Sequence, residues 1–363
     1  MRIAVYAIAK NEAQFAERFM RSCADADVVV VADTGSTDST VAQLQSWGAT
    51  VYPIAISPWR FDRARDAALA LVPADVDVCI SLDLDEVLTP GWRAELERVW
   101  TPGTTRLRYE YEWGSGVQFG YEKIHARAGY HWHHPCHEYP RPDGRIREVW
   151  AETDALLVRH LPDHSKSRGQ YLDLLALSVK EDPTCPRNAF YYARELTFYG
   201  QHAQAVEALH RYLAMPAASW AHERSYAMRL LGASYAVLGR DAEAATWFER
   251  ATLEMPDARE PWLAWARHAY TREDWPTCYR TATAGLTLTT RHLVYTADPA
   301  CWDASLPDLA ALAAYHLGYH DDAIRYGREA VKLAPGDDRL QRNFEFYYRA
   351  GGAFLPGAKE AHV

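Results

Sequence analysis

Two aspartates at the end of an apolar segment are the residues of this chain best placed for chemistry. Asp83 and Asp85 lie in the run SLDLDE (residues 81–86), and the apolar residues 76–82 predict a buried strand. Residues two apart on an extended strand point the same way, so both carboxylates would face one ligand. Like charges held together favour a cation between them, which predicts a divalent metal ion carrying a diphosphate. The competing interpretation is an acidic loop that caps the following helix.

Composition and charge restrict the classes of function. At 363 residues the chain exceeds one average domain, so we expect two. A net charge of −9 offers no general basic surface for nucleic acid, although Arg141, Arg145 and Arg147 form a local basic patch that keeps DNA open. The 6 cysteines are scattered without a Cys-x-x-Cys pair, which predicts reduced thiols in a cytoplasmic protein. Neither a signal peptide nor a membrane-spanning run is expected.

The N-terminal part of the chain alternates predicted strands and helices, which must position the two aspartates. We expect strands over residues 3–9, 27–32 and 50–56, and helices over residues 12–23 and 41–47. This order predicts an α/β domain with a mostly parallel sheet. Ligands of such sheets bind at the carboxyl ends of the strands.

Polar residues follow these strands where a ligand is expected. Asp33 ends the second strand and begins the run DTGSTDST (residues 33–40), in which Gly35 permits a tight turn and the Ser, Thr and Asp side chains suit a helix cap. Asp33 is also a candidate to accept hydrogen bonds from a nucleoside. Arg63 and Arg65 come after the third strand, where either side chain could pair with a diphosphate or form a structural ion pair.

Together these motifs resemble family 2 glycosyltransferases of the GT-A fold. The segments AKNE (9–12), DTGSTD (33–38), ARDA (64–67) and LDLDE (82–86) have the order and approximate spacing of that family. The family more often has Arg-Asn where this chain has Arg65-Asp66. The resemblance covers residues 1–165. It implies a Rossmann-like, mostly parallel sheet and inverting transfer of a sugar from a nucleotide donor, most often a UDP-sugar.

The resemblance also implies roles for single residues. The nucleoside and diphosphate pocket would be lined by Ala9, Glu12, Asp33, Arg65, Asp83 and Leu84. Asp83 would reach the ribose and the waters of a Mn²⁺ or Mg²⁺ ion, and Asp85 would bind the ion itself. The ion would neutralise charge on the departing diphosphate. His160, at the end of a short apolar strand, would complete the metal shell or touch the diphosphate; the alternative is a capped strand end.

The middle of the chain offers candidates for activating the acceptor. Glu138 is the preferred general base, since inversion needs a carboxylate or imidazole beside the attacking hydroxyl or thiol. The pair His137-Glu138 resembles a His-Glu pair in members of the family with helical extensions. The alternatives are His137, Glu110 and Glu112. The histidines between His125 and His137 match no standard zinc spacing, and their aromatic neighbours favour a substrate cleft.

Helical repeats are predicted from residue 166 onward. One copy has small and apolar residues at the offsets of a tetratricopeptide repeat: Gly232, Tyr235, Ala244, Phe248, Ala251 and Pro256. Moving one period of about 34 residues from Gly232 leads to Ala266. Further copies are visible around Ala193 and Ala311, and an insertion at residues 291–303 interrupts the series. Each helix pair would need its neighbours to bury its apolar face.

The sequence therefore predicts a GT-A domain over residues 1–165, an all-α tetratricopeptide-like domain over 166–350 and a flexible tail over 351–363. The expected function is metal-dependent inverting transfer from a UDP-sugar to a hydroxyl or thiol of a macromolecular acceptor, namely a protein, a glycan or a modified nucleobase in DNA. The repeats would hold that acceptor or mediate self-association into a homo-oligomer.

Two other classes of function stay open at this point. One is an inactive GT-A domain on a repeat scaffold for protein–protein interaction, and the joint presence of Asp33, Arg65, Asp83 and Asp85 argues against it. The other is a nucleotidyltransferase that uses the same aspartates. A glycine-rich loop with a basic residue would be expected after its first strand, and the AKNE segment lacks that loop.

Overall fold

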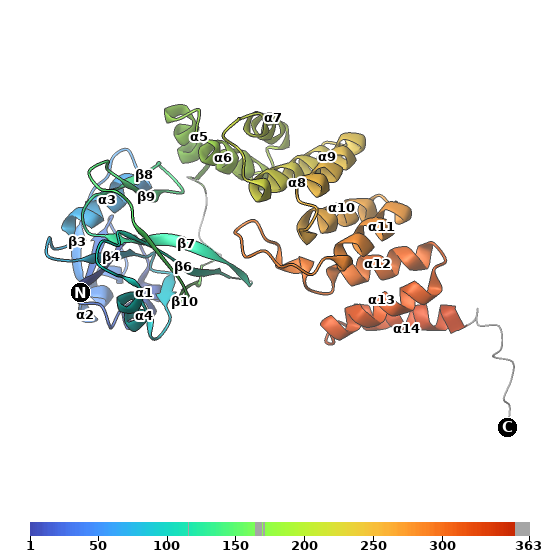
Figure 1. Cartoon of the computed structure of the whole chain (residues 1–363), viewed down its shortest axis with the longest axis horizontal. Helices are drawn as coiled ribbons and strands as arrows, with labels where there is room; N and C mark the ends of the chain where they lie inside the picture. The colour runs from blue at the N-terminus through green and yellow to red at the C-terminus, as the bar shows by residue number, and fades with distance from the viewer. Residues whose placement is uncertain (115, 164–168, 170, 353–363) are drawn as a thin grey trace, which may run out of the picture. The chain divides into compact units, whose positions relative to one another are not determined.

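The computed structural model of the chain describes residues 1–114, 116–163, 169 and 171–352. These residues divide into two compact units, Met1–Pro183 with Leu293–Tyr295 and Thr184–His292 with the chain from Thr296 onward (Figure 1). The predicted boundary between residues 165 and 166 lies outside the described residues, as do residues 353–363 of the predicted tail. Within the described part of the chain, no helix is long and apolar enough to cross a membrane.

The first unit is built on an 8-stranded sheet with the order β3-β2-β1-β4-β7-β6-β10-β5. Its strands are β1 (Ile3–Ala9), β2 (Val28–Asp33), β3 (Thr50–Pro53), β4 (Val78–Ser81), β5 (Glu86–Leu88), β6 (Arg106–Trp113), β7 (Val117–Ala126) and β10 (Trp150–His160). Strands β3, β2, β1 and β4 are parallel. Strand β7 runs antiparallel to β4 and β6, while β10 is parallel to β6 and antiparallel to β5. The α/β fold with a mostly parallel first half is confirmed.

Helices cover both faces of this sheet, which explains why its central strands are continuously apolar. The helices of the unit are α1 (Ala13–Ser22), α2 (Thr40–Ser46), α3 (Phe61–Leu71), α4 (Trp92–Val99) and α5 (Tyr171–Glu181). Along β1, Val5 packs in one core with Phe19 of α1. The next residue, Tyr6, packs in the opposite core with Ala68 of α3. A separate hairpin, β8 (Tyr130–His133) and β9 (Tyr139–Pro142), lies next to α3.

The carboxyl ends of six strands, β3, β2, β1, β4, β6 and β10, lie along the same side of the sheet. Parallel registers bring Ala9 of β1 beside Asp33 of β2, and place Ser81 of β4 beside Tyr6. Because β7 is antiparallel to both β4 and β6, strand β6 runs in the same direction as β4. Strand β10 is parallel to β6, so the paired residues Trp113 and His160 also lie at this edge. We call the edge defined by the carboxyl ends of these six strands the carboxyl edge. The predicted site residues Asp33, Asp83 and His160 all lie along it.

The second unit consists of helices that follow one another as antiparallel pairs (Figure 1). They are α6 (Pro186–Phe198), α7 (His202–Leu213), α8 (Ala221–Val237), α9 (Asp241–Glu254), α10 (Arg259–Thr271), α11 (Trp275–Thr287), α12 (Ser305–His316), α13 (His320–Leu333) and α14 (Asp338–Gly352). Gly232 of α8 is needed for close packing, since a Cβ there would lie 2.8 Å from the ring of Phe248 on α9. The predicted helical repeats are confirmed, and the insertion between α11 and α12 contains the short helix η1 (Pro299–Cys301).

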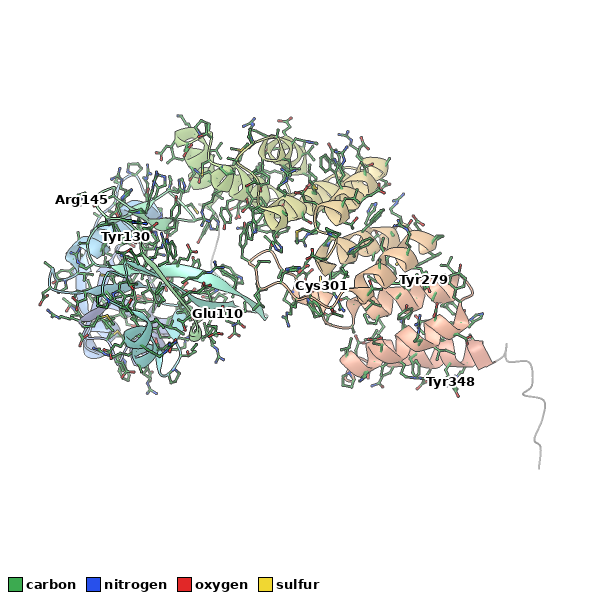
Figure 2. The ribbon with its side chains drawn as sticks, viewed as in Figure 1. Glu110, Tyr130, Arg145, Tyr279, Cys301 and Tyr348 are labelled. Carbon is green, nitrogen blue, oxygen red and sulfur yellow. The ribbon has the colours of Figure 1, made fainter. Side chains whose placement is uncertain are left out.

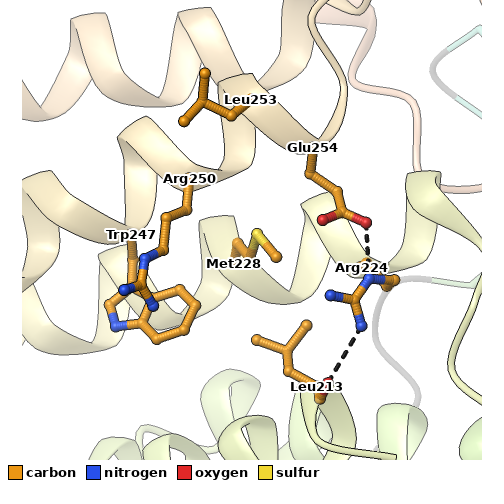
Figure 3. Close-up of a pocket in the computed structure, with 7 residues that line it drawn as sticks. All are labelled: Leu213, Arg224, Met228, Trp247, Arg250, Leu253 and Glu254. Atoms are coloured by element: carbon orange, nitrogen blue, oxygen red, sulfur yellow. Dashed lines mark hydrogen bonds and ion pairs between the residues drawn. The ribbon is translucent and has the colours of Figure 1, made fainter. Parts of the chain in front are cut away.

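A pocket of about 390 Å³ lies within the second unit (Figure 3). Its walls come from α7, α8 and α9 and comprise Leu213, Arg224, Met228, Trp247, Arg250, Leu253 and Glu254. The Arg250 guanidinium lies 4.6 Å from the centre of the Trp247 ring, and Arg224 donates to Glu254 at 2.7 Å. Every residue that the sequence predicts for catalysis or donor binding lies in the first unit, so this pocket is not the predicted site.

Candidate active site

Arg65 is the buried centre of the site, with 3% of its surface exposed. From α3, its Nε donates to Glu138 Oε1, its Nη1 donates to Ser81 Oγ at 3.2 Å and its Nη2 donates to Asp83 Oδ1 at 2.6 Å. The guanidinium also lies 4.9 Å from the ring centre of Trp132. Burial alone would lower the pKa of Arg65, but the charges of Asp83 and Glu138 outweigh it and raise the pKa well above its usual value. Arg65 therefore stays charged and ties three chain segments together.

A second buried cation, Lys123 of β7, lies on the other side of Asp83. Its Nζ is 3.5 Å from Asp83 Oδ2 and 3.7 Å from Glu86 Oε1. Tyr111 donates to the same Glu86 oxygen at 2.7 Å, and Glu86 Oε2 accepts from the backbone N–H of Asp83 at 2.9 Å. Burial alone would raise the pKa of Asp83, but Arg65 and Lys123 outweigh it and lower that pKa. Asp83 is thus an ionised carboxylate with each oxygen facing a fixed cation.

The segment between β4 and β5 is a turn, so the prediction that it is extended is wrong. Strand β4 ends at Ser81, and the backbone N–H of Glu86 donates to the Asp83 carbonyl at 2.9 Å. The chain must reverse here because β5 pairs with β10 immediately afterwards. As a result Asp83 faces Arg65 and Lys123, whereas Asp85 faces His160.

Asp85 and His160 form the second pair of predicted site residues that the structure brings together. Their Oδ2 and Nε2 atoms are 3.4 Å apart, and the backbone N–H of Leu161 donates to the Asp85 carbonyl at 2.8 Å. Burial alone would lower the pKa of His160, but the hydrogen bond and charge of Asp85 outweigh it and raise the pKa. Among the described residues, none provides a hydrogen-bond partner for the buried His160 Nδ1.

The charges of the site fit a divalent cation. Four carboxylates meet two permanent cations here, so negative charge is in excess: Asp83, Asp85, Glu86 and Glu138 against Arg65 and Lys123. Excess carboxylate charge beside an imidazole suits Mn²⁺ or Mg²⁺. Within the described ranges, no three His, Cys, Asp or Glu side chains are already grouped at metal-binding spacing. Asp85 and His160 are the pair that would hold the ion, with Asp83 close by.

The loops after β1 and β2 are joined by hydrogen bonds at the carboxyl edge. Asp33 Oδ2 accepts from the backbone N–H groups of Gly35 at 3.1 Å and of Ser36 at 3.0 Å. The carbonyl of Ala9 accepts from the backbone of Thr34 at 2.9 Å, and the backbone N–H of Glu12 donates to a threonine hydroxyl of the second loop at 2.7 Å. The structure thus brings Ala9, Glu12 and Asp33 together as predicted.

Leu84 contributes to the core and not, through its side chain, to the surface of the site. Only 1% of the residue is exposed, and it packs with the core that covers one face of the sheet. The donor contact that the resemblance implies for Leu84 would therefore have to come from its backbone.

Glu138 reaches Arg65 through the loop between β8 and β9. The loop contains two residues with left-handed backbone angles, His134 at φ 81° and His137 at φ 53°. It is anchored to the start of α3, where the backbone N–H of Phe61 donates to the Pro135 carbonyl at 3.0 Å. The ring of His137 lies 6.2 Å from that of Tyr171. The hairpin therefore presents Glu138 to the guanidinium and turns His137 toward α5.

Asp66 anchors the same hairpin by a hydrogen bond. This contact gives a structural role to the aspartate that stands where the family more often has asparagine. Its Oδ1 accepts from the backbone N–H of Trp132 at 2.7 Å. An asparagine oxygen could accept the same hydrogen bond. The position of Trp132 under Arg65 therefore needs an acceptor at residue 66, and either amino acid supplies one.

The other candidate bases lie on β6 and are engaged by neighbouring strands. Glu110, labelled in Figure 2, accepts from Gln118 Nε2 at 3.2 Å. Glu112 accepts from Arg159 Nε at 2.9 Å. In the predicted basic patch, Arg145 (Figure 2) donates through Nε to Asp143 at 2.7 Å, so part of its charge is balanced within the loop.

Comparison with known families assigns the first part of this unit. Residues 5–104 match the family model described as Glycosyl transferase family 2. The chain carries a family 2 glycosyltransferase domain. The matched range includes Arg65, Asp83 and Asp85, so the site described above lies largely within the glycosyltransferase match. Glu138 and His160 lie beyond it and join the domain through the hairpin and through β10.

Solved structures resemble the second unit weakly. They include the APC/C hetero-tetramer Cut9-Hcn1 (17% identity, TM-score 0.38, 51% of this chain and 33% of that chain). Another is YrrB, a TPR protein with an unusual peptide-binding site (13% identity, TM-score 0.40, 50% of this chain and 85% of that chain). The chain spans a third of the length of the Cut9-Hcn1 chain that it matches. The assignment of repeats beside the glycosyltransferase domain rests on the helix pairs themselves.

Sequence reasoning missed Lys123, which neutralises Asp83 in the glycosyltransferase domain. The signal was present: Lys123 follows Phe119 and Tyr121 at two-residue spacing in a strand, and 6% of it is exposed. A lysine among aromatic residues on one face of a strand indicates a buried ion pair.

The role of His125, the first of the histidines between residues 125 and 137, was also not predicted from the sequence. Its Nδ1 lies 2.8 Å from the Ala126 carbonyl, its Nε2 accepts from the Tyr6 hydroxyl at 2.8 Å, and that hydroxyl accepts from Trp132 Nε1 at 2.8 Å. Burial lowers the pKa of His125 to about 4, so the ring is neutral. His125 therefore holds Trp132 beneath Arg65.

Proposed function

We propose that the protein is a metal-dependent inverting glycosyltransferase that moves a sugar from a UDP-sugar to a hydroxyl or thiol of a macromolecular acceptor. The observation that supports this most is the double use of Arg65. One buried guanidinium holds Asp83 of the metal and donor site and Glu138 of the acceptor hairpin. An arrangement that fixes both carboxylates relative to each other suits a reaction between two bound substrates.

The donor would lie along the carboxyl edge. Its nucleoside would bind over the loops of Asp33, and its diphosphate would lie near Arg65 and Asp83. Guanidinium groups pair with phosphate oxygens in a planar, two-contact geometry. Because Arg65 and Lys123 are fixed by burial before any ligand arrives, the donor would meet a preorganised charge pattern.

The metal ion would be held by Asp85 and His160. When bound, Mn²⁺ or Mg²⁺ supplies Lewis-acid stabilisation of the charge that develops on the departing diphosphate. Asp83, whose two oxygens face Arg65 and Lys123, would orient the ribose and the waters of the ion. The raised pKa of His160 makes metal binding compete with its proton, so affinity for the ion should increase as the pH rises.

Glu138 would act as the general base. Arg65 donates to its Oε1, which leaves Oε2 as the atom that would take the proton from the acceptor. The guanidinium would then stabilise the orientation of the carboxylate throughout the reaction. His137, Glu110 and Glu112 are the other candidates, and the last two already accept hydrogen bonds on β6.

The helical repeats would bind the acceptor or a second copy of the chain. Paired helices present extended surfaces that single domains of this size lack. The excess of acidic residues over basic ones favours a protein or glycan acceptor over DNA. A cytoplasmic location would agree with the lack of disulfides among the described residues.

Calorimetric titration with UDP, ADP, GDP and CDP tests this proposal. We expect UDP to bind, and to bind more tightly with Mn²⁺ than with EDTA, because the ion bridges the diphosphate and Asp85. Tighter binding of ADP, GDP or CDP than of UDP would mean that the donor carries that nucleotide instead. A protein that binds none of the four with or without Mn²⁺ would contradict the proposal.

A further inference from the structure

A half-exposed tryptophan ends β6 at the carboxyl edge. Trp113 has 49% of its surface exposed, although its ring centre lies 4.6 Å from that of His160 and 6.3 Å from that of Tyr111. Tyr111 is buried and donates to Glu86. The indole is therefore backed by two fixed rings and presents its remaining surface to solvent. An exposed indole beside a polar site is a candidate to contact a ligand, because it offers an apolar face and an N–H donor.

The order of the strands places Trp113 beyond the diphosphate end of the donor site. Asp33 ends β2 and Ser81 ends β4, with β1 between them. Trp113 and His160 end β6 and β10, on the far side of β4 from Asp33 in the strand order. A nucleotide-sugar laid from Asp33 past Asp83 would carry its sugar in this direction. The residue that the sugar would reach next is Trp113.

We propose that Trp113 is a stacking platform for the pyranose ring of the donor's sugar. This inference rests on the proposed function, because it assumes the donor's orientation along the carboxyl edge. One face of a pyranose consists largely of C–H groups, which the negative face of an aromatic ring attracts and which gain from leaving water. Tyr111 is buried and lacks the exposure that stacking requires, whereas Trp113 has it.

The platform would also couple the sugar to the metal site. The face of Trp113 toward His160 is close enough to restrict the imidazole, and His160 lies 3.4 Å from Asp85. A sugar stacked on the indole would sit next to the residues proposed to hold the ion. The bond to be broken, between the sugar and the diphosphate, would then lie between the platform and the ion.

Trp150 offers a matched control on the same sheet. It is 45% exposed, and its ring lies 4.7 Å from the Arg106 guanidinium. Trp150 begins β10, whereas Trp113 ends the parallel strand β6, and the partner of Trp150 in the register is Arg106. The two tryptophans are thus similarly exposed but lie at opposite ends of neighbouring strands. Loss of either indole removes similar exposed area.

The test is calorimetric titration of the full chain with UDP and with UDP-glucose, UDP-galactose and UDP-N-acetylglucosamine, in Mn²⁺. For the sugar that the wild type binds best, Trp113→Ala should weaken binding by about tenfold while leaving UDP binding unchanged. Trp113→Phe should recover much of the loss, and Trp150→Ala should change neither affinity.

Weakening of UDP binding and UDP-sugar binding by the same factor would overturn the platform, because Trp113 would then only support His160. Unchanged binding of both by Trp113→Ala would overturn it too. A wild type that binds neither UDP nor any UDP-sugar would instead remove the proposed function, and the platform with it.

Discussion

Arg65 Nη2 lies 2.6 Å from Asp83 Oδ1, so a helix after the third strand is tied to the turn after the fourth. The same guanidinium donates to Glu138, so both carboxylates are bound to one side chain. The position of Asp83 relative to Glu138 therefore depends on one buried side chain.

Replacement of Arg65 by lysine should damage both functions of the guanidinium. One ammonium cannot reproduce the forked contacts to Asp83 and Glu138, so a buried carboxylate would lose its partner. We expect unfolding to become easier by about 3 kcal/mol and UDP affinity to fall by at least about tenfold. Urea unfolding and UDP titration measure the two effects. The control is Arg98→Lys at an exposed position of α4, which should change neither.

The role of Glu138 can be separated into proton transfer and positioning. Glutamine keeps an oxygen that accepts from Arg65 Nε but takes no proton, whereas alanine removes both. If Glu138 is the base, Glu138→Gln should retain UDP affinity while transfer falls by roughly 10²- to 10⁴-fold. Rates of transfer and UDP titration for both variants provide the check. Nearly normal transfer by Glu138→Gln, with loss in Glu138→Ala, would show that Glu138 only positions Arg65.

The buried His125 predicts a pH dependence of stability. Burial lowers its pKa from 6.5 to about 4. Below pH 6.5 His125 is therefore protonated in the unfolded chain but stays neutral in the folded chain. Stability from this residue is complete above pH 6.5 and is lost as the pH falls toward 4, by about 3 kcal/mol in total.

Urea unfolding between pH 7 and pH 4 measures this contribution. The free energy of unfolding of His125→Gln should fall less over this range than that of the wild type. His131→Gln, a change at a partly exposed histidine, serves as the control and should follow the wild type. Equal pH dependence in His125→Gln and the wild type would show that His125 is charged in the folded protein.

Gly232 allows the repeat domain to be perturbed apart from the active site. A Cβ at this position would lie 2.8 Å from the Phe248 ring, so Gly232→Ala should destabilise the second unit by about 1–3 kcal/mol. Gly336→Ala meets no atom within 4 Å and is the matched control. If the repeats hold the acceptor, Gly232→Ala should lower transfer more than UDP release from the donor alone. Equal losses of both rates would show that the repeats mainly stabilise the catalytic unit.

Elements defined by local pattern were predictable from the sequence. The expected strand over 3–9 is β1, and the expected helix over 12–23 is α1 (Ala13–Ser22), because continuous apolar residues and helical spacing are local signals. The expected strand over 50–56 is shorter, since β3 pairs with β2 only as far as Pro53. These elements brought Ala9, Glu12 and Asp33 together as expected.

Contacts between distant segments were not predictable. Lys123 meets Asp83 because β7 returns antiparallel beside β4, and no local pattern specifies that neighbour. Glu138 meets Arg65 because a hairpin 73 residues later docks on α3. The turn at Asp83–Glu86 depends on the pairing of β5 with β10, which follows only from the complete sheet.

The central claim is metal-dependent turnover of a nucleotide-sugar at Asp85. The most direct measurement is release of UDP from a panel of UDP-sugars by the wild type, by Asp85→Ala and by Asp154→Ala, an exposed aspartate of β10. We predict release by the wild type and by Asp154→Ala with Mn²⁺, loss of release in EDTA with recovery on adding Mn²⁺, and background release by Asp85→Ala. Release by Asp85→Ala at the wild-type rate, in a folded protein with Mn²⁺ present, would contradict the account.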